Sequence, residues 1–172
     1  MNILIVVDMQ NDFISGALGT DEAKAIVPKV KKRIESFSGE VIFTRDTHGE
    51  DYLSTREGKK LPVSHCIKGT WGHEICPELL PLAQGCRIFD KPTFGSEELA
   101  RYVSDLAKSE TIESITLMGL CTDICVISNA MLIKAALPET DIYVDGAASA
   151  GVTPKSHTNA LEAMKMCQIE VI

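Results

Sequence analysis

The segment Gly119–Val126, with the sequence GLCTDICV, places two cysteines where a strand is expected to give way to a helix. The apolar run 115–118 before it is typical of a buried strand, and residues 126–137 after it are typical of a helix. Cys125 would then lie in the first helical turn, where free backbone N–H groups and the helix dipole favour a thiolate and can stabilise an oxyanion. The pattern indicates a cysteine nucleophile on a tight turn. The alternative is that Cys125 is a buried cysteine with a purely structural role.

Two further residues with useful chemistry follow apolar runs elsewhere in the chain. Asp8 ends the run 2–7, where a carboxylate either caps a turn or acts as a base. Lys91 ends the run 87–90, where an ordinary surface lysine is the alternative. With Cys125 they form a coherent set, because Asp8 could take the thiol proton and hand it to a leaving amine. Lys91 could hold the charge of Asp8 in place and favour the thiolate.

Asp46, His48 and His65 form a second group of candidate residues. A carboxylate and two imidazoles can bind a divalent ion and leave positions open for water or substrate. On spacing alone, the alternative is an aspartate and two loop histidines that are unrelated. His73 could be a further ligand, and we interpret it as a loop histidine.

The elements that must position these residues alternate along the chain. We expect strands at 2–7, 40–44, 87–90, 114–118, 141–144 and 168–172, and helices at 21–37, 96–107, 122–137 and 154–166. This order predicts an α/β fold: a six-stranded, mostly parallel sheet with helices on both faces, a Rossmann-like three-layer sandwich. Ligands of such sheets bind beyond the carboxyl ends of the strands. The residues expected on that rim are Asp8, Asp46, His48, Lys91, Cys125 and Asp145.

Composition narrows the class of protein. The 172 residues suit one domain spanning 1–172, and the net charge of −7 with no large basic cluster argues against a nucleic-acid partner. No apolar run approaches the roughly 20 residues of a membrane span. The apolar N-terminus lacks a basic leader and meets Asp8 early, so we expect a cytoplasmic protein. The six cysteines show no paired metal spacing, which also makes a redox or metal role for Cys121 and Cys125 the weaker reading.

Four segments, 7–13, 44–48, 90–94 and 119–126, resemble those of the isochorismatase-like cysteine hydrolases, a superfamily that includes the nicotinamidases. The resemblance implies a catalytic triad of Asp8, Lys91 and Cys125. It also implies a cis peptide bond before Cys121, with the amides of Cys121 and Cys125 forming the oxyanion hole.

The same resemblance bears on the second group of residues. It implies that Asp46, His48 and His65 hold a divalent metal ion, zinc in the first place and otherwise iron or manganese, which favours the nicotinamidase branch. Phe13 matches a position that contacts the substrate ring. The chain departs from the nicotinamidases before His65, where Leu61 stands in a stretch without the usual aromatic residue. Trp71 is the candidate to replace it.

These features predict a cysteine amidohydrolase that cleaves a small carboxamide, nicotinamide to nicotinate and ammonia, through a thioester. The nearest alternative is the same triad acting on another small amide or a carbamoyl compound. An alternative of another class is a catalytically silent binding or redox domain. The long excursion 46–85 has apolar residues without a clear period, and we expect it to wall the active site and to contribute to a homo-oligomer, with Trp71 near the pocket.

Overall fold

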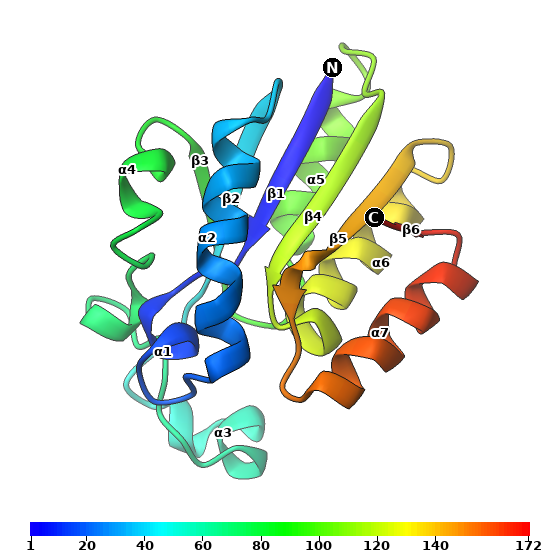
Figure 1. Ribbon diagram of the computed structural model, residues 1–172. Helices are drawn as coiled ribbons and strands as arrows, with labels where there is room; N and C mark the ends of the chain where they lie inside the picture. The colour runs from blue at the N-terminus through cyan, green and yellow to red at the C-terminus, as the bar shows by residue number, and fades with distance from the viewer.

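The computed structural model describes residues 1–172 and contains one six-stranded sheet in the order β3-β2-β1-β4-β5-β6 (Figure 1). Every neighbouring pair of strands is parallel. The strands are β1 (Asn2–Val7), β2 (Glu40–Asp46), β3 (Arg87–Lys91), β4 (Ser114–Leu120), β5 (Asp141–Ala150) and β6 (Glu170–Val171). The expected α/β fold with a six-stranded sheet is therefore confirmed.

Helices cover both faces of this sheet (Figure 1). The α-helices are α1 (Asn11–Ile14), α2 (Asp21–Glu35), α3 (Arg56–Lys60), α4 (Leu80–Ala83), α5 (Glu97–Leu106), α6 (Ile127–Ala136) and α7 (Pro154–Met166). Short 3₁₀ turns, η1 (Tyr52–Ser54) and η2 (Trp71–His73), and one π-helical turn, η3 (Thr122–Val126), complete the chain. None of these helices has the length and apolar character needed to cross a membrane.

The alternation of side chains along β1 creates two separate cores. Leu4 and Val6 point to one face, where they pack with α2, and Ile3, Ile5 and Val7 point to the other, where they pack with α5, α6 and α7. All five side chains are fully buried, which explains why the strand reads as a continuous apolar run. The sheet is thus the rigid middle layer on which the functional residues are mounted.

Three of the long helices begin at residues whose side chains cap them. Each of these capping side chains accepts one hydrogen bond, from the backbone N–H of the residue three positions later. The caps are Thr20 at the start of α2, Ser96 at the start of α5 and Thr153 at the start of α7. Thr153 forms a full capping box, and Pro154 occupies the first helical position, where its missing N–H costs nothing. These sequence signals fix the helix starts close to where the sequence predicts them.

The strand order changes direction between β1 and β4. From β1 the chain builds outward through β2 and β3, and from β4 it builds the other way through β5 and β6. The two adjacent carboxyl ends therefore open a crevice at this switch point, the usual ligand site of such sheets. Gly119 near the end of β4 has φ +122°, and a Cβ there would lie 2.2 Å from the Val7 carbonyl oxygen. Only glycine permits this close approach.

Two elements differ from those that the sequence predicts. β5 continues to Ala150, past a shift in register between Leu117 and Gly119 of β4. Asp145 therefore lies within the strand, where its Oδ1 accepts from the Ala148 N–H at 3.0 Å and its Oδ2 lies 3.6 Å from Arg33 Nε. The expectation that Asp145 stands on the ligand-binding rim is wrong. The helix expected over 122–137 is divided into η3 and α6.

The excursion 46–85 is compact. It contains η1, α3, η2 and α4, and the side chains of Cys66, Cys76, Leu79 and Ala83 enter the core on the α2 face. One backbone hydrogen bond from the His48 N–H to the Cys66 carbonyl, at 3.0 Å, and one from the Lys68 N–H to the His48 carbonyl, at 2.9 Å, close its first half into a loop beyond the carboxyl end of β2. Figure 1 shows α3 at that end of the molecule, below the sheet.

Candidate active site

Asp8, Lys91 and Cys125 meet at the switch point between β1 and β4. Lys91 Nζ lies 2.7 Å from Asp8 Oδ2 and 3.4 Å from Cys125 Sγ. Asp8 and Lys91 are fully buried, and Cys125 is nearly so. The structure thus brings together the three residues that the sequence proposes as a triad, from the ends of β1 and β3 and from η3.

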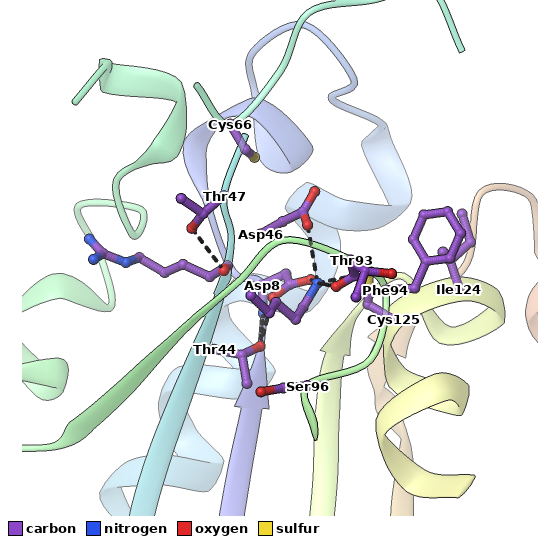
Figure 2. Close-up of polar contacts among 12 residues, drawn as sticks. Asp8, Thr44, Asp46, Thr47, Cys66, Thr93, Phe94, Ser96, Ile124 and Cys125 are labelled. Atoms are coloured by element: carbon purple, nitrogen blue, oxygen red, sulfur yellow. Dashed lines mark hydrogen bonds and ion pairs between the residues drawn. The ribbon is translucent and has the colours of Figure 1, made fainter. Parts of the chain in front are cut away.

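A second layer of contacts orients these three side chains (Figure 2). Thr44 on β2 donates its hydroxyl to Asp8 Oδ1 at 2.6 Å, while Asp8 Oδ2 has no partner besides the Lys91 ammonium. Lys91 Nζ also donates to the Thr93 carbonyl at 3.1 Å and to Asp46 Oδ1 at 3.3 Å. The ammonium group therefore sits between two carboxylates, a carbonyl oxygen and the sulfur.

Burial controls the charges of the triad. It raises the pKa of Asp8, and the neighbouring Lys91 charge offsets this only in part. It also raises the pKa of the Cys125 thiol well above its usual range, with the Asp8 charge acting in the same direction. Burial alone would lower the pKa of Lys91, but the charges of the Asp8 and Asp46 carboxylates outweigh it and raise that pKa. At rest, Cys125 is thus a neutral thiol and Lys91 an ammonium ion. The sequence leads us to expect a thiolate at Cys125.

The turn that carries Cys125 exposes backbone N–H groups. The Leu120–Cys121 peptide bond is cis, as the resemblance implies. The Cys121 carbonyl accepts the N–H groups of Ile124 and Val126, so the Cys125 N–H does not make the usual bond to the fourth residue before it. The Cys121 N–H donates no hydrogen bond within the chain. Both amides named for an oxyanion hole are in this way withheld from ordinary helix bonding.

A cavity of about 250 Å³ opens above Cys125. Most of its wall is apolar, formed by Phe13, Leu18, Leu61, Phe94, Leu120, Ile124 and Val152. Its polar surface comes chiefly from Cys125 on one side and from Asp46, Glu57 and His65 on the other. An apolar pocket with polar groups at two points suits a small ring compound with one reactive polar substituent.

The second group of candidate residues forms a tight cluster beside this cavity. Asp46, His48 and His65 are joined by Glu57, and the ligand atoms of all four lie within 4.8 Å of one another. His48 Nε2 lies 2.9 Å from Asp46 Oδ2 and 3.7 Å from Glu57 Oε1, and His65 Nε2 lies 3.5 Å from Asp46 Oδ2. Two imidazole nitrogens and carboxylate oxygens are donors that suit a zinc-like divalent ion.

The surroundings of the cluster orient its imidazoles. His65 Nδ1 lies 2.8 Å from the Val63 carbonyl, which fixes this nitrogen as the donor and leaves Nε2 free to coordinate. The ring of Tyr52 packs against those of His48 and His65, with centroids 4.6 and 4.9 Å away. Burial would raise the pKa of Asp46, but hydrogen bonds from both histidines and the Lys91 charge hold it below its usual range. The carboxylate is therefore ionised and ready to bind a cation.

Glu57, Phe94 and Thr44 are site residues that the sequence reasoning missed. Glu57 belongs to a charged stretch, REGKK, whose residues give no sign that one of them turns inward. Phe94 is the last residue of the family-like segment 90–94 that contains Lys91, so its position near the site was open to prediction. Thr44 lies on β2 beside the end of β1, and only the parallel register places it next to Asp8.

Two residues of the excursion lie away from the cavity. Trp71 is 55% exposed and borders a separate groove with Ile14, Pro28 and Pro77, while its carbonyl accepts from Asn11 Nδ2 at 2.8 Å. This bond holds η2 against α1 and turns the indole outward, which corrects the expectation that Trp71 lies at the pocket. His73 Nε2 contacts the Thr47 hydroxyl at 2.8 Å and is not part of the cluster, in agreement with its reading as a loop histidine. Phe13 lines the cavity as expected.

Comparison with known proteins identifies relatives along the whole chain. The chain is 25% identical over 186 residues to the nicotinamidase/pyrazinamidase of Mycobacterium tuberculosis, an alignment that covers all of this chain and 98% of that protein. The crystal structure of the Pyrococcus horikoshii pyrazinamidase in complex with zinc is similar with a TM-score of 0.80 and 28% identity, covering 99% of this chain and 98% of that one. The N-carbamoylsarcosine amidase of Thermoplasma acidophilum gives a TM-score of 0.78 and 26% identity over 99% and 94% of the two chains.

These relatives are amidases, which are hydrolases of C–N bonds, and that is the enzyme class that the sequence predicts. The family model described as the Isochorismatase domain matches residues 2–172. The chain therefore belongs to the isochorismatase family.

Proposed function

We propose that this protein is a cysteine-dependent amidohydrolase that converts nicotinamide to nicotinate and ammonia through a thioester on Cys125. One observation carries the proposal: Lys91 Nζ contacts both Cys125 Sγ, at 3.4 Å, and the Asp8 carboxylate, at 2.7 Å, at the base of an apolar cavity. A buried nucleophile, a carboxylate and an ammonium in contact have no evident structural purpose, because an apolar set would pack there at lower cost.

Asp8 is the proton carrier in this scheme. Burial raises the pKa of Asp8, which makes its carboxylate a stronger base than an exposed aspartate, and the pKa of Cys125 is raised as well. Asp8 takes the thiol proton as Cys125 Sγ attacks the carboxamide carbon. The C–S bond forms, and the carbonyl oxygen becomes an oxyanion that the N–H groups of Cys121 and Cys125 stabilise.

Collapse of this intermediate releases ammonia. Asp8 returns its proton to the amide nitrogen, the C–N bond breaks, and a thioester remains on Cys125. A water molecule then gives a proton to Asp8 and attacks the thioester carbon. The C–S bond breaks, the sulfur recovers the proton from Asp8, and the carboxylic acid leaves. Lys91 stays protonated throughout and keeps Asp8 in reach of the sulfur.

Asp46, His48 and His65, together with Glu57, are the residues that would hold a divalent metal ion. Their donor set fits, because Nε2 of His65 is presented by a fixed tautomer and Asp46 is ionised. When bound, such an ion supplies a Lewis-acid contact for a ring nitrogen of the substrate. The chain itself then surrounds the ring with an apolar wall that includes Phe13 and Phe94 and excludes water.

A carbamoyl compound is the second candidate substrate. The structural similarity to an N-carbamoylsarcosine amidase favours it, as does Leu61, an aliphatic residue in the wall of the cavity. A carbamoyl substrate has no ring nitrogen and gains nothing from a metal ion placed beside the cavity. Dependence on the metal therefore separates the two candidates.

The test is ammonia release from a panel of nicotinamide, pyrazinamide and N-carbamoyl amino acids, each measured with and without a chelator. We expect nicotinamide to be the best substrate and its hydrolysis to be chelator-sensitive. Cys125→Ala should lose activity by on the order of 10³-fold or more, while Cys121→Ala, which keeps its backbone amide, should be milder. Fast turnover by Cys125→Ala would exclude the thioester route.

The same measurements address the third reading, a silent binding or redox domain. A protein that releases no ammonia from any amide of the panel would be a silent binding or redox domain and not an amidohydrolase. We also propose that the enzyme is cytoplasmic and forms a homo-oligomer.

A further inference from the structure

Asn129 is a buried amide in α6, one turn after Cys125, and its exposed fraction is 1%. Its Nδ2 donates to the Cys125 carbonyl at 2.8 Å and to the Phe94 carbonyl at 3.2 Å. Its Oδ1 accepts from the Ser96 N–H at 2.9 Å. One side chain thus joins the turn that carries the sulfur to the loop between β3 and α5.

These three bonds use the side chain almost completely. An asparagine has two N–H donors, and both are engaged here, together with its oxygen. The bond to Cys125 is local, but those to Phe94 and Ser96 cross to residues more than 30 positions away in sequence. Such long-range hydrogen bonds do not stabilise the helix itself. They hold the loop against the helix.

The loop held in this way carries two parts of the site. The Thr93 carbonyl accepts from Lys91 Nζ at 3.1 Å, and the Phe94 ring lines the cavity beside Ile124. Figure 2 shows Thr93, Phe94 and Ser96 following one another along the chain past Cys125. A shift of this loop would therefore move an acceptor that orients the ammonium and a wall of the cavity together.

Packing of the loop on α6 supports the same conclusion. A Cβ on Gly95 would lie 2.6 Å from Leu132 Cδ1, so the loop backbone rests directly on the helix. Asn129 makes a hydrogen bond on either side of this contact, donating to the Phe94 carbonyl and accepting from the Ser96 N–H. Asn129 therefore ties the loop to the helix on both sides of the Gly95 contact.

We propose that Asn129 is a positioning residue that couples the substrate wall at Phe94 and the orientation of Lys91 to the backbone of the nucleophile. The inference rests on the proposed function in taking Cys125 as the nucleophile. Asn129 touches neither substrate nor reacting atoms. It acts through Phe94, Thr93 and Cys125.

Two substitutions of Asn129 test the proposal. Asn129→Leu keeps the approximate shape and removes all three hydrogen bonds. Asn129→Thr keeps a hydroxyl that can still donate to the Cys125 carbonyl one turn back, but it is too short to bridge to the loop. Ser128→Ala is the matched control, because it removes a side-chain hydrogen bond to the Ile124 carbonyl in the same helical turn and breaks no hydrogen bond to the loop.

The two readouts are steady-state kinetics with nicotinamide and the pH dependence of Cys125 alkylation by iodoacetamide. For both Asn129 variants we expect a Michaelis constant raised by about tenfold, the scale expected of a displaced substrate wall. The alkylation midpoint should move to higher pH, because Lys91, which lowers the pKa of Cys125, is held less firmly. Ser128→Ala should leave both unchanged.

Folded Asn129→Leu and Asn129→Thr with wild-type values in both readouts would overturn the proposal, as would equal changes in Ser128→Ala. If Asn129→Leu fails to fold, Asn129→Thr decides alone. A wild-type protein that hydrolyses no amide refutes the proposed function but not this inference, because the alkylation profile is measured without substrate.

Discussion

At the scale of single residues, the site consists of charged side chains that are buried, and removing such charges from water costs free energy unless they are paired. Asp8, Lys91 and Asp46 alternate in sign over contacts of 2.7 and 3.3 Å, and the Lys91 ammonium stabilises both carboxylates. The thiol of Cys125 joins this chain of charges as a neutral group. In the proposed reaction its proton can leave only if a neighbouring base receives it, and Asp8 is the residue we propose for that role.

Thr44→Val tests the role of Asp8 through the pH dependence of kcat/KM. The Thr44 hydroxyl donates to the ionised carboxylate and so holds the pKa of Asp8 below the value that burial alone would give. Without it, that pKa rises, Asp8 stays protonated to higher pH, and the acidic limb should move up by about one pH unit. Activity above the limb should be retained.

Thr116→Val is the matched control for this experiment, since Thr116 is another buried threonine of the sheet and has no side-chain hydrogen bond to the triad. An acidic limb that stays at the wild-type pH in Thr44→Val would show that another group than Asp8 governs it.

His48→Ala tests the metal cluster separately from the triad. Removal of one of the two imidazole ligands should lower metal affinity by roughly 100-fold or more, because even the outer contacts of such ligands are worth 10- to 100-fold. The Michaelis constant for nicotinamide should rise, while the rate of Cys125 alkylation should stay close to that of the wild type. Elemental analysis of the purified proteins measures the first effect.

His73→Gln is the control, because the His73 ring contacts Thr47 and lies outside the cluster. Equal metal content in wild type and His48→Ala would contradict the assignment of the cluster. It would also shift the favoured substrate to one without a ring nitrogen.

At the scale of elements, the sequence predicts what local patterns determine. The apolar run of β1 and the capped helices α2, α5 and α7 lie within about two residues of their expected bounds, because burial on both faces and capping side chains are visible in sequence. Most of the triad and the cluster could be named because each residue follows a recognisable strand or belongs to a family-like segment.

The elements that the sequence does not predict depend on tertiary contacts. The second half of β5, GAASA, has small residues with little strand preference, and it is a strand because it pairs with β4 beyond a bulge. α3 is a five-residue helix whose role is to turn Glu57 toward the cavity. Helices this short have no periodic signal, so Glu57 could not be recognised.

Gly119→Ala tests the close approach of β1 and β4 that builds the crevice. The added Cβ would meet the Val7 carbonyl oxygen at 2.2 Å in a backbone conformation with φ +122°. We expect the free energy of unfolding to fall by on the order of 3 kcal/mol, since both clash and backbone strain contribute. Urea unfolding measures it.

Gly85→Ala separates the two contributions, because Gly85 has φ +82° but a Cβ there meets nothing within 4 Å. It should cost about 1 kcal/mol, the backbone part alone. Equal destabilisation by the two substitutions would show that the close contact between the strands is not what glycine provides at position 119.

At the scale of the whole molecule, the excursion 46–85 divides into two parts with different roles. Its first part supplies Asp46, Glu57, Leu61 and His65 to the cavity. Its second part, from η2 to α4, packs on the α2 face and leaves Trp71 and Leu80 exposed. The prediction that the excursion walls the active site thus applies to the first part, and the prediction of an oligomer contact rests on the second.

Trp71→Gln tests that oligomer contact. The indole borders a groove of about 510 Å³ between α1, α2 and the segment 76–78, whose lining mixes apolar residues with Lys24, Lys31 and Glu78. A tryptophan exposed by 55% beside such a groove is typical of a contact surface. We expect light scattering after size exclusion to show a smaller species for Trp71→Gln than for wild type at equal concentration. Because Trp71 does not line the cavity, the Michaelis constant should stay unchanged when activity is measured per folded chain.

Ile88→Gln, which alters an exposed apolar residue on the edge strand β3, is the control. A wild-type mass for Trp71→Gln would assign the indole to the packing of its own chain.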